Sequence, residues 1–337
     1  MIRIRARAPL RVSYAGGGTD VPPYPDLKGG VVLSSTIENY AYCSIAPRDD
    51  KKITISKENQ AFHLAADDLD ELKGSGEVEF VKAVAHRFHP PSGFDVNLRY
   101  DALPGTGLGS SSALCVSLIG AFRDWEGRSM TDYDVANLAY QVERKDVGIP
   151  GGMQDQYAST FGGFNLIEFR REANIVNSLR IKRETLNELE YNSLLCFTGS
   201  TRQSGGILQR QISSYENKDP RVLEALDQMK DLTFQMKDLL LTGNLTDFAT
   251  LLNSEWELKK ALDRGISTES TETLLKAARE AGALGGKLLG AGGGGFLLLY
   301  CEPGKQVQVQ NAIEGLDART FPVRFDQDGL QTWRSTR

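Results

Sequence analysis

Alternation of hydrophobic and polar residues runs through much of the first half of the chain, and a period of two is typical of half-buried strands. Hydrophobic residues three or four positions apart predict helices, which dominate the second half. The change in pattern predicts a domain boundary between residues 180 and 190. Predicted strands lie at 2–8, 31–47, 51–56, 94–100, 163–169, 175–181, 191–197, 296–301 and 319–325. Predicted helices lie at 67–72, 79–88, 114–125, 131–148, 155–161, from 206 onward, 220–243, 245–262 and 271–282.

A loop rich in glycine and serine, from Pro104 to Ser112, joins the strand at 94–100 to the helix that follows. Three of its glycines lack the Cβ atoms that would keep a ligand away from the backbone. Three serines then open the helix, where unpaired N–H groups and the helix dipole favour an anion. This order predicts a phosphate-binding loop; the alternative is a plain glycine turn with a serine cap. The residues concerned are Pro104, Gly105, Gly107, Leu108, Gly109, Ser110, Ser111 and Ser112.

Two familiar phosphate-binding sequences do not describe this chain. The pattern G-x-x-x-x-G-K-[ST] is absent from the sequence. Residues Gly290 to Gly295 fit G-x-G-x-x-G formally, but we expect a helix before them and a strand after them. The dinucleotide fingerprint needs a strand first and a helix second, so this interpretation fails.

Two more glycine-rich stretches lie near the ends of the chain. Gly16, Gly17 and Gly18 are followed by Thr19 and Asp20, which predicts a tight loop suited to polar contacts with a small molecule, or else a plain turn. The other stretch, 290–295, precedes the strand at 296–301.

Several charged residues allow a functional and a structural interpretation. Asp155 begins a short helix, where an acidic side chain is commonly a partner of the helix dipole. Arg202 lies among small and hydroxyl residues before a helix, which predicts either an anion pocket or a capped loop with an arginine in solvent. The arginines at positions 3, 5 and 7 belong to the solvated face of the first strand or to the rim of a site.

Composition narrows the class of protein. The 337 residues are long enough for two domains, and 40% hydrophobic with 25% charged residues is ordinary for a globular protein. A net charge of −5 argues against binding of nucleic acid or anionic membranes. No signal-peptide pattern or membrane-spanning run is evident, and the four separated cysteines predict buried, reduced thiols in a cytoplasmic protein. The three histidines predict no metal site.

Taken together, the three glycine-rich stretches resemble the motifs of the GHMP family of small-molecule kinases. The first motif resembles Pro9–Val12 through Asp20, and the third resembles 290–295. The second, P-x-x-x-G-L-G-S-S, is read at 104–111 with one residue fewer after the proline. The resemblance covers essentially the whole chain. It implies an α+β fold of two domains, with a mixed sheet and helices in residues 1–185 and an α/β sandwich in 186–337.

Within the family, two stretches resemble the branch that phosphorylates the anomeric hydroxyl of D-glycero-D-manno-heptose 7-phosphate. These are A-G-G-G-T-D-x-P-P-Y at 15–24 and the run at 198–208. A galactokinase would carry Glu and His where this chain has Gly17 and Gly18, which counts against galactokinase activity. The resemblance therefore implies ATP and Mg²⁺ as cofactors, a sugar phosphate as the partner, and a monomer or homodimer.

The resemblance also implies roles for individual residues. Residues 104–112 would wrap the phosphates of ATP, and Ser111 with Glu143 would hold Mg²⁺. Asp155 would accept the proton of the sugar hydroxyl, while Arg11 would keep Asp155 ionised and offset charge on the transferring group. The substrate-binding residues would be Gly17, Gly18, Thr19, Asp20, Arg202, Gly292 and Gly293.

Three other activities remain open from the sequence. A kinase for another sugar of the fucose or galactose type, or for a mevalonate-type alcohol, would keep the same loops. A sensor that binds ATP and sugar without turnover would not need to keep Asp155. A diphosphate decarboxylase shares the fold, but the Thr19–Asp20 loop suits a polyol better than a methylated acid. Substrate identity rests on analogy within a fold, so a panel of substrates decides among these activities.

Overall fold

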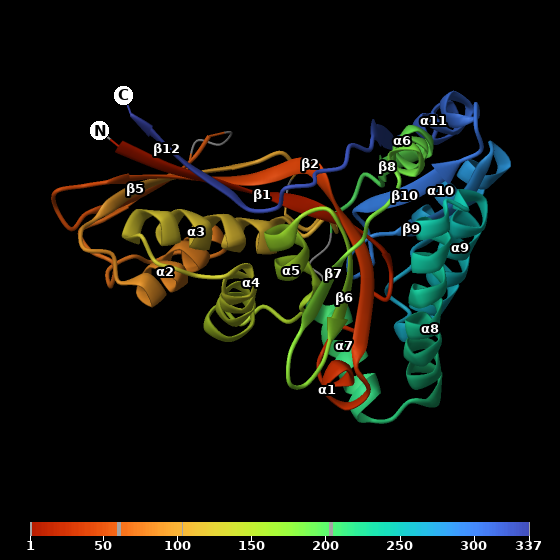
Figure 1. The fold of residues 1–337 in the computed structure, drawn as a ribbon, viewed down its shortest axis with the longest axis horizontal. Coiled ribbons are helices and arrows are strands. Elements are labelled where there is room, and N and C mark those ends of the chain that lie inside the picture. The colour runs from red at the N-terminus through yellow and green to blue at the C-terminus, as the bar shows by residue number, and fades with distance from the viewer. Residues whose placement is uncertain (1, 59–61, 103, 202–204, 337) are drawn as a thin grey trace.

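The structure, a computed structural model, describes residues 2–58, 62–102, 104–201 and 205–336. It contains two β-sheets (Figure 1). The larger sheet has the order β12-β1-β2-β5-β3-β4, with β6 and β7 joined to β2. All its pairs are antiparallel except β3 with β5, so the predicted mixed sheet is confirmed. Its strands are β1 (Ile2–Ala15), β2 (Gly30–Pro47), β3 (Ile53–Lys57), β4 (Phe62–Ala66), β5 (Phe94–Tyr100), β6 (Phe164–Phe169), β7 (Ile175–Ser178) and β12 (Gln331–Thr336).

Helices from the first half of the chain lie on one face of this sheet (Figure 1). The central one, α3 (Ser110–Glu126), packs against β1 and β2 and is buried on nearly all sides, which explains its almost continuous apolar sequence. The others are α2 (Glu77–Phe88), α4 (Asp132–Gln141), the π-helix η1 (Val142–Asp146) and α5 (Gln154–Phe161). The short helix α1 (Tyr24–Lys28) lies apart from them, and its Tyr24 ring packs against Tyr215 of the second half.

The smaller sheet is antiparallel, with the order β11-β8-β10-β9, and several helices of the second half pack on it (Figure 1). The helix Pro220–Thr242 packs instead on the helix that follows it and on the larger sheet. Its strands are β8 (Ser193–Phe197), β9 (Ala283–Leu288), β10 (Phe296–Cys301) and β11 (Arg319–Pro322). The helices are α6 (Arg183–Asn192), α7 (Gly205–Glu216), α8 (Pro220–Thr242), α9 (Leu245–Leu262), α10 (Glu269–Glu280) and α11 (Gln306–Glu314). The last strand, β12, returns to pair with β1, so the chain crosses back after the predicted 1–185 and 186–337 division.

Some predicted elements are wrong. The predicted helix at 67–72 is a turn, in which Asp68 Oδ1 accepts hydrogen bonds from the N–H groups of Asp70 and Glu71. The segment before the third glycine stretch is the strand β9, not a helix. Gly285 in β9 lies so close to α9 that an added Cβ would be 1.8 Å from the carbonyl oxygen of Ala249. The third glycine stretch thus joins two strands of a hairpin, which still excludes the dinucleotide fingerprint.

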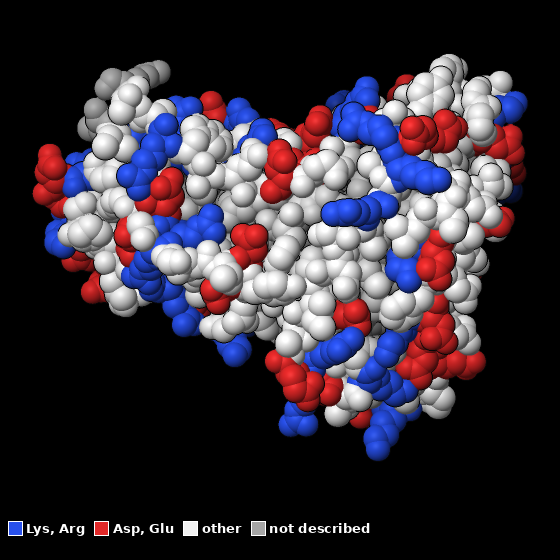
Figure 2. Space-filling view, in the orientation of Figure 1, with Lys and Arg blue, Asp and Glu red and all other residues white. Residues whose placement is uncertain are grey.

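The pattern also misses α6, β4, α11 and β12, all short and largely exposed. The four cysteines are buried and form no disulfide, as predicted. Within the described ranges, no helix is both long enough and apolar enough to cross a membrane. Acidic and basic side chains are interspersed on the face that Figure 2 shows.

Candidate active site

The second and third glycine-rich stretches contact each other through their backbones. A Cβ added to Gly107 would lie 2.6 Å from the carbonyl oxygen of Leu289, and one added to Gly290 would lie 2.6 Å from the Cα atom of Gly107. The N–H of Phe296 donates to the carbonyl oxygen of Thr106 at 3.0 Å. Gly107 and Gly290 have φ angles of +83° and +71°, which glycine adopts without strain. Segments that are about 180 residues apart therefore form one surface only because side chains are missing there.

A cleft opens beside this contact, and all three glycine-rich stretches line it. The remaining walls come from η1, α5, α7 and α9. Ser111 and Asp155 both face this cleft, as the interpretation of the loops requires.

Asp155, at the start of α5, forms an ion pair with Arg11 of β1. Arg11 Nε and Nη2 lie 2.8 Å and 2.7 Å from Asp155 Oδ1, and Arg11 Nη1 donates to the carbonyl oxygen of Gly107 at 2.5 Å. The arginine side chain is 3% exposed and that of Asp155 is 20% exposed. Gly109 lies against the carboxylate, since an added Cβ would be 3.3 Å from Oδ2. Arg11 therefore links the carboxylate to the second glycine-rich loop.

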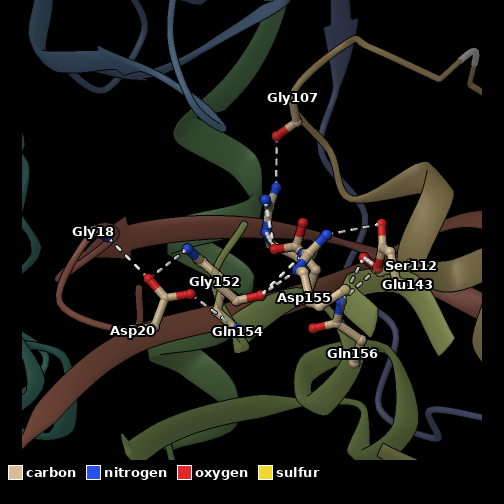
Figure 3. A network of polar contacts seen from close by, with 11 residues as sticks. Gly18, Asp20, Gly107, Ser112, Glu143, Gly152, Gln154, Asp155 and Gln156 are labelled. Atoms are coloured by element: carbon tan, nitrogen blue, oxygen red, sulfur yellow. Dashed lines mark hydrogen bonds and ion pairs between the residues drawn. The ribbon is translucent and has the colours of Figure 1, made fainter. Parts of the chain in front are cut away.

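Glu143 is a buried carboxylate, and Asp155 lies between it and Asp20 (Figure 3). The residue is 2% exposed. The chain changes there to the π-helix η1, with the Val147 N–H donating to the Val142 carbonyl at 2.9 Å, and such insertions are frequent at functional sites. Ser112 Oγ donates to Glu143 Oε2 at 2.6 Å, and Gln156 Nε2 donates to the same oxygen. Arg144 Nη1 is 3.4 Å from Oε1.

The donor set beside the cleft suits Mg²⁺ when a nucleotide supplies further oxygens. Glu143 offers a carboxylate, and Ser111 offers a hydroxyl on the same cleft wall. Magnesium in proteins is commonly held by one or two carboxylates together with waters and phosphate oxygens. The described residues contain no cluster of three or more His, Cys, Asp or Glu side chains that could hold a metal by themselves.

The first glycine-rich stretch forms a rigid loop around Asp20 (Figure 3). Asp20 Oδ1 accepts from the N–H of Gly18 and from Gln154 Nε2 at 3.0 and 3.2 Å, and Oδ2 accepts from the N–H of Gln154 at 3.0 Å. A Cβ on Gly152 would lie 2.0 Å from Oδ2, so glycine is needed for this approach. Asp20 thereby fixes the loop to the start of α5, next to Asp155.

Most of the predicted site residues meet in the cleft, and a few have other positions. Thr19 is 0% exposed, and its hydroxyl donates to the carbonyl oxygens of Gly16 and Val31, so it shapes the loop and does not face the cleft. Arg202 lies outside the described residues. Those on the cleft wall are Arg11, Gly17, Gly18, Asp20, Gly105, Gly107, Gly109, Ser110, Ser111, Ser112, Glu143, Asp155 and Gly292. Pro104, Leu108 and Gly293 are not among the lining residues.

Several residues on the cleft wall carry no clear signal in the sequence. Gln154 and Arg144 belong to segments that were singled out for other residues. Lys259 lies in α9, where the Lys259–Lys260 pair has the pattern of an ordinary solvated face. The one available signal was its spacing of four from Glu255, which places both side chains on the same face of the helix.

Comparison with known proteins agrees with this geometry. The sequence matches the GHMP kinases N terminal domain over residues 78–163 and the GHMP kinases C terminal domain over 236–316. It is 35% identical to the D-glycero-alpha-D-manno-heptose 7-phosphate kinase of Campylobacter jejuni, over 99% of this chain and 100% of that protein. It is 28% identical to the L-fucokinase/L-fucose-1-P guanylyltransferase of Bacteroides fragilis, over 98% of this chain but 38% of that protein.

A solved structure extends the likeness to three dimensions. The crystal structure of a D-glycero-D-manno-heptose 1-phosphate kinase from Bacteroides thetaiotaomicron has a TM-score of 0.82 and 34% identity, covering 99% of this chain and 100% of that one. The motifs, the fold and these relatives together show that the chain belongs to the GHMP kinase family.

Proposed function

We propose that this protein transfers the γ-phosphoryl group of ATP to the anomeric hydroxyl of a sugar phosphate, and that the sugar is D-glycero-D-manno-heptose 7-phosphate. The observation that carries the proposal is the Arg11–Asp155 pair, which sets a carboxylate against Gly109 of the loop proposed to bind ATP phosphates. The likeness to the Campylobacter jejuni protein supports the choice of acceptor.

Asp155 is the proposed general base. Both contacts from Arg11 go to Oδ1, and Oδ2 makes no hydrogen bond with the described part of the chain. Oδ2 therefore accepts the proton of the acceptor hydroxyl, while Arg11 fixes the orientation of the carboxylate. An anomeric hydroxyl is more acidic than an ordinary alcohol, so proton removal need not precede phosphoryl transfer, and positioning and charge stabilisation carry most of the catalysis.

The remaining parts have separate tasks. The glycine backbone at 105–109 and the start of α3 bind the phosphates of ATP, because the N-terminal end of a helix and its dipole favour anions. Arg11 offsets negative charge on the transferring group. Glu143 and Ser111 hold Mg²⁺, which neutralises phosphate charge when it is bound. Asp20 and Gln154 fix the loop that contacts the sugar.

A panel of acceptors with ATP tests the proposal. The relatives differ in name, one being a heptose 7-phosphate kinase and the other a heptose 1-phosphate kinase, so the panel contains both phosphates, together with unphosphorylated heptose, fucose, galactose and mevalonate. We expect the highest kcat/KM for the 7-phosphate, with ³¹P NMR placing the new phosphate at the anomeric carbon. Preference for fucose, galactose or mevalonate, or phosphorylation at another position, would refute the proposal. Tight binding of ATP and sugar without turnover would identify a sensor instead.

A further inference from the structure

Lys259 of α9 brings an ammonium group to the sugar side of the cleft. The residue is 6% exposed, lines the cleft and is part of no kinase motif discussed above. A Cβ added to Gly17 would lie 3.4 Å from Lys259 Nζ, 3.5 Å from Gln154 Nε2 and 3.5 Å from Ser13 Oγ. Three polar side chains from α9, α5 and β1 therefore gather around one glycine of the first loop.

These polar groups are incompletely paired within the protein. Ser13 Oγ and Gln154 Oε1 are buried and have no hydrogen-bond partner among the residues that the structure describes. Within the described ranges, Lys259 forms no ion pair with a carboxylate. The neighbouring carboxylates have other partners: Glu255 Oε1 bonds to Lys287 and to the N–H of Gly16, and Asp20 bonds to Gly18 and Gln154. Glu255 Oε2 is buried without a hydrogen-bond partner among the described residues, but no Lys259–Glu255 ion pair forms there. Lys259 is a desolvated cation that faces the cleft and contacts no anion in the described part of the chain. An anionic ligand would offset the cost of this desolvation best.

The charges around Lys259 support an anionic ligand. The pKa of Lys259 is lowered to about 8, mainly by burial and also by the charges of Lys287 and Arg11, while Glu255 and Asp20 oppose this shift. Asp155, also on the cleft wall, is neutralised by Arg11. A phosphate dianion beside Nζ would stabilise the charged ammonium, whereas a neutral sugar hydroxyl would not offset the desolvation of the cation.

We propose that Lys259 binds the phosphate that the acceptor already carries. The inference rests on the proposed function for the identity of the acceptor. Gly17, against which Nζ lies, belongs to the loop proposed to bind the sugar, and the proposed ATP-phosphate loop is a different one, centred on Gly107. This position favours the acceptor's phosphate over the γ-phosphate of ATP. Lys259 is thus a determinant of selectivity for a phosphorylated sugar.

Kinetics of three variants test the proposal. Lys259→Met removes the charge, Lys259→Arg keeps it, and Lys260→Met is the matched control, because Lys260 pairs with Glu257 and Glu272 outside the cleft. Loss of a charged hydrogen bond predicts a KM for heptose 7-phosphate that is roughly 10- to 100-fold higher in Lys259→Met, with the KM for ATP unchanged. The KM for unphosphorylated heptose should change little, Lys259→Arg should recover most of the effect, and Lys260→Met should behave as the wild type. A kcat loss with both KM values unchanged would mean a contact with the transferring phosphoryl group, and equal effects on both heptoses would mean a contact with the sugar; either result overturns the proposal.

A binding experiment separates this inference from the proposed function. If the wild type does not phosphorylate heptose 7-phosphate, the proposed function fails, yet inorganic phosphate still probes the anion site. With a non-hydrolysable ATP analogue at saturation, phosphate should raise the melting temperature of the wild type, and Lys259→Met should need at least roughly tenfold more phosphate for the same shift. No phosphate effect in the wild type, or the same dependence in both proteins, would overturn the inference.

Discussion

Replacing Gly107 by alanine tests whether the contact between the second and third glycine-rich stretches forms the nucleotide site. At a φ of +83°, a left-handed backbone costs an alanine about 1–2 kcal/mol. The new Cβ would also lie 2.6 Å from the carbonyl oxygen of Leu289, so the two loops must separate by about 0.8 Å to reach the 3.4 Å of ordinary contact. Gly107→Ala should therefore lose stability and move the backbone that binds ATP.

Gly304→Ala separates these two effects. Gly304 has a φ of +80° and no atom within 4 Å of an added Cβ, so it incurs the backbone cost without the contact. Displacement of positioning groups by about 1 Å can cost about 100-fold in rate, so we expect kcat/KM for ATP to fall roughly 10- to 100-fold in Gly107→Ala and to stay unchanged in Gly304→Ala. Urea unfolding gives the stability of each variant, and steady-state kinetics at saturating acceptor give kcat/KM. If Gly107→Ala kept wild-type kcat/KM for ATP while it unfolded like Gly304→Ala, the loop contact would have no part in nucleotide binding.

Three further predictions concern charged groups of the site and its support. Glu143→Gln should raise the Mg²⁺ concentration for half-maximal rate roughly 10- to 100-fold, and an unchanged Mg²⁺ titration would remove Glu143 from the metal site. Glu255→Met leaves Lys287 as an unpaired buried charge and should cost about 3–5 kcal/mol in urea unfolding, much of it recovered when Lys287 is also changed to Met; additive losses would contradict the buried pair. Because the pKa of Lys259 is lowered to about 8, its charge is lost as pH rises through 8, so the KM for the phosphorylated acceptor should rise above pH 8 in the wild type and stay flat in Lys259→Arg. Between pH 8 and the ordinary lysine pKa of 10.5, Lys259 binds more protons in the unfolded chain than in the folded protein. The free energy of unfolding of the ligand-free wild type should therefore rise with pH over this range. Urea unfolding of the wild type and of Lys259→Met in a pH series measures the rise that Lys259 contributes.

The sequence predicts best those parts of the fold where local pattern and burial agree. The strand β5 alternates between buried apolar and half-buried polar residues, and α3 is apolar because it is enclosed between the sheet and its neighbouring helices. The pattern fails where tertiary contact decides. Residues 283–288 contain two glycines and follow a helix, and they form a strand because α9 packs directly on the backbone of Gly285.

The candidate site likewise has parts that the sequence predicts and parts that only tertiary contacts create. Glycine-rich stretches are visible as sequence, and Arg11, Glu143 and Asp155 follow from the resemblance to a family. Their meeting in one cleft depends on backbone contacts between residues such as Gly107 and Leu289, which no local pattern contains. Lys259 was missed for a related reason: a lysine on an amphipathic helix indicates solvent, and only the packing of α9 beneath the first glycine loop turns it toward the cleft. The burial of Glu143 likewise depends on the π-helix η1, which hydrophobic periodicity does not predict.

Turnover by Asp155→Asn, measured together with its affinity for ATP, tests most directly whether a carboxylate at the junction of the glycine loops acts on the acceptor hydroxyl. The amide keeps the size of the side chain but cannot accept the proton. The account predicts that kcat falls roughly 10²- to 10⁴-fold while the dissociation constant for ATP stays unchanged. A variant that turns over at nearly the wild-type rate would contradict it.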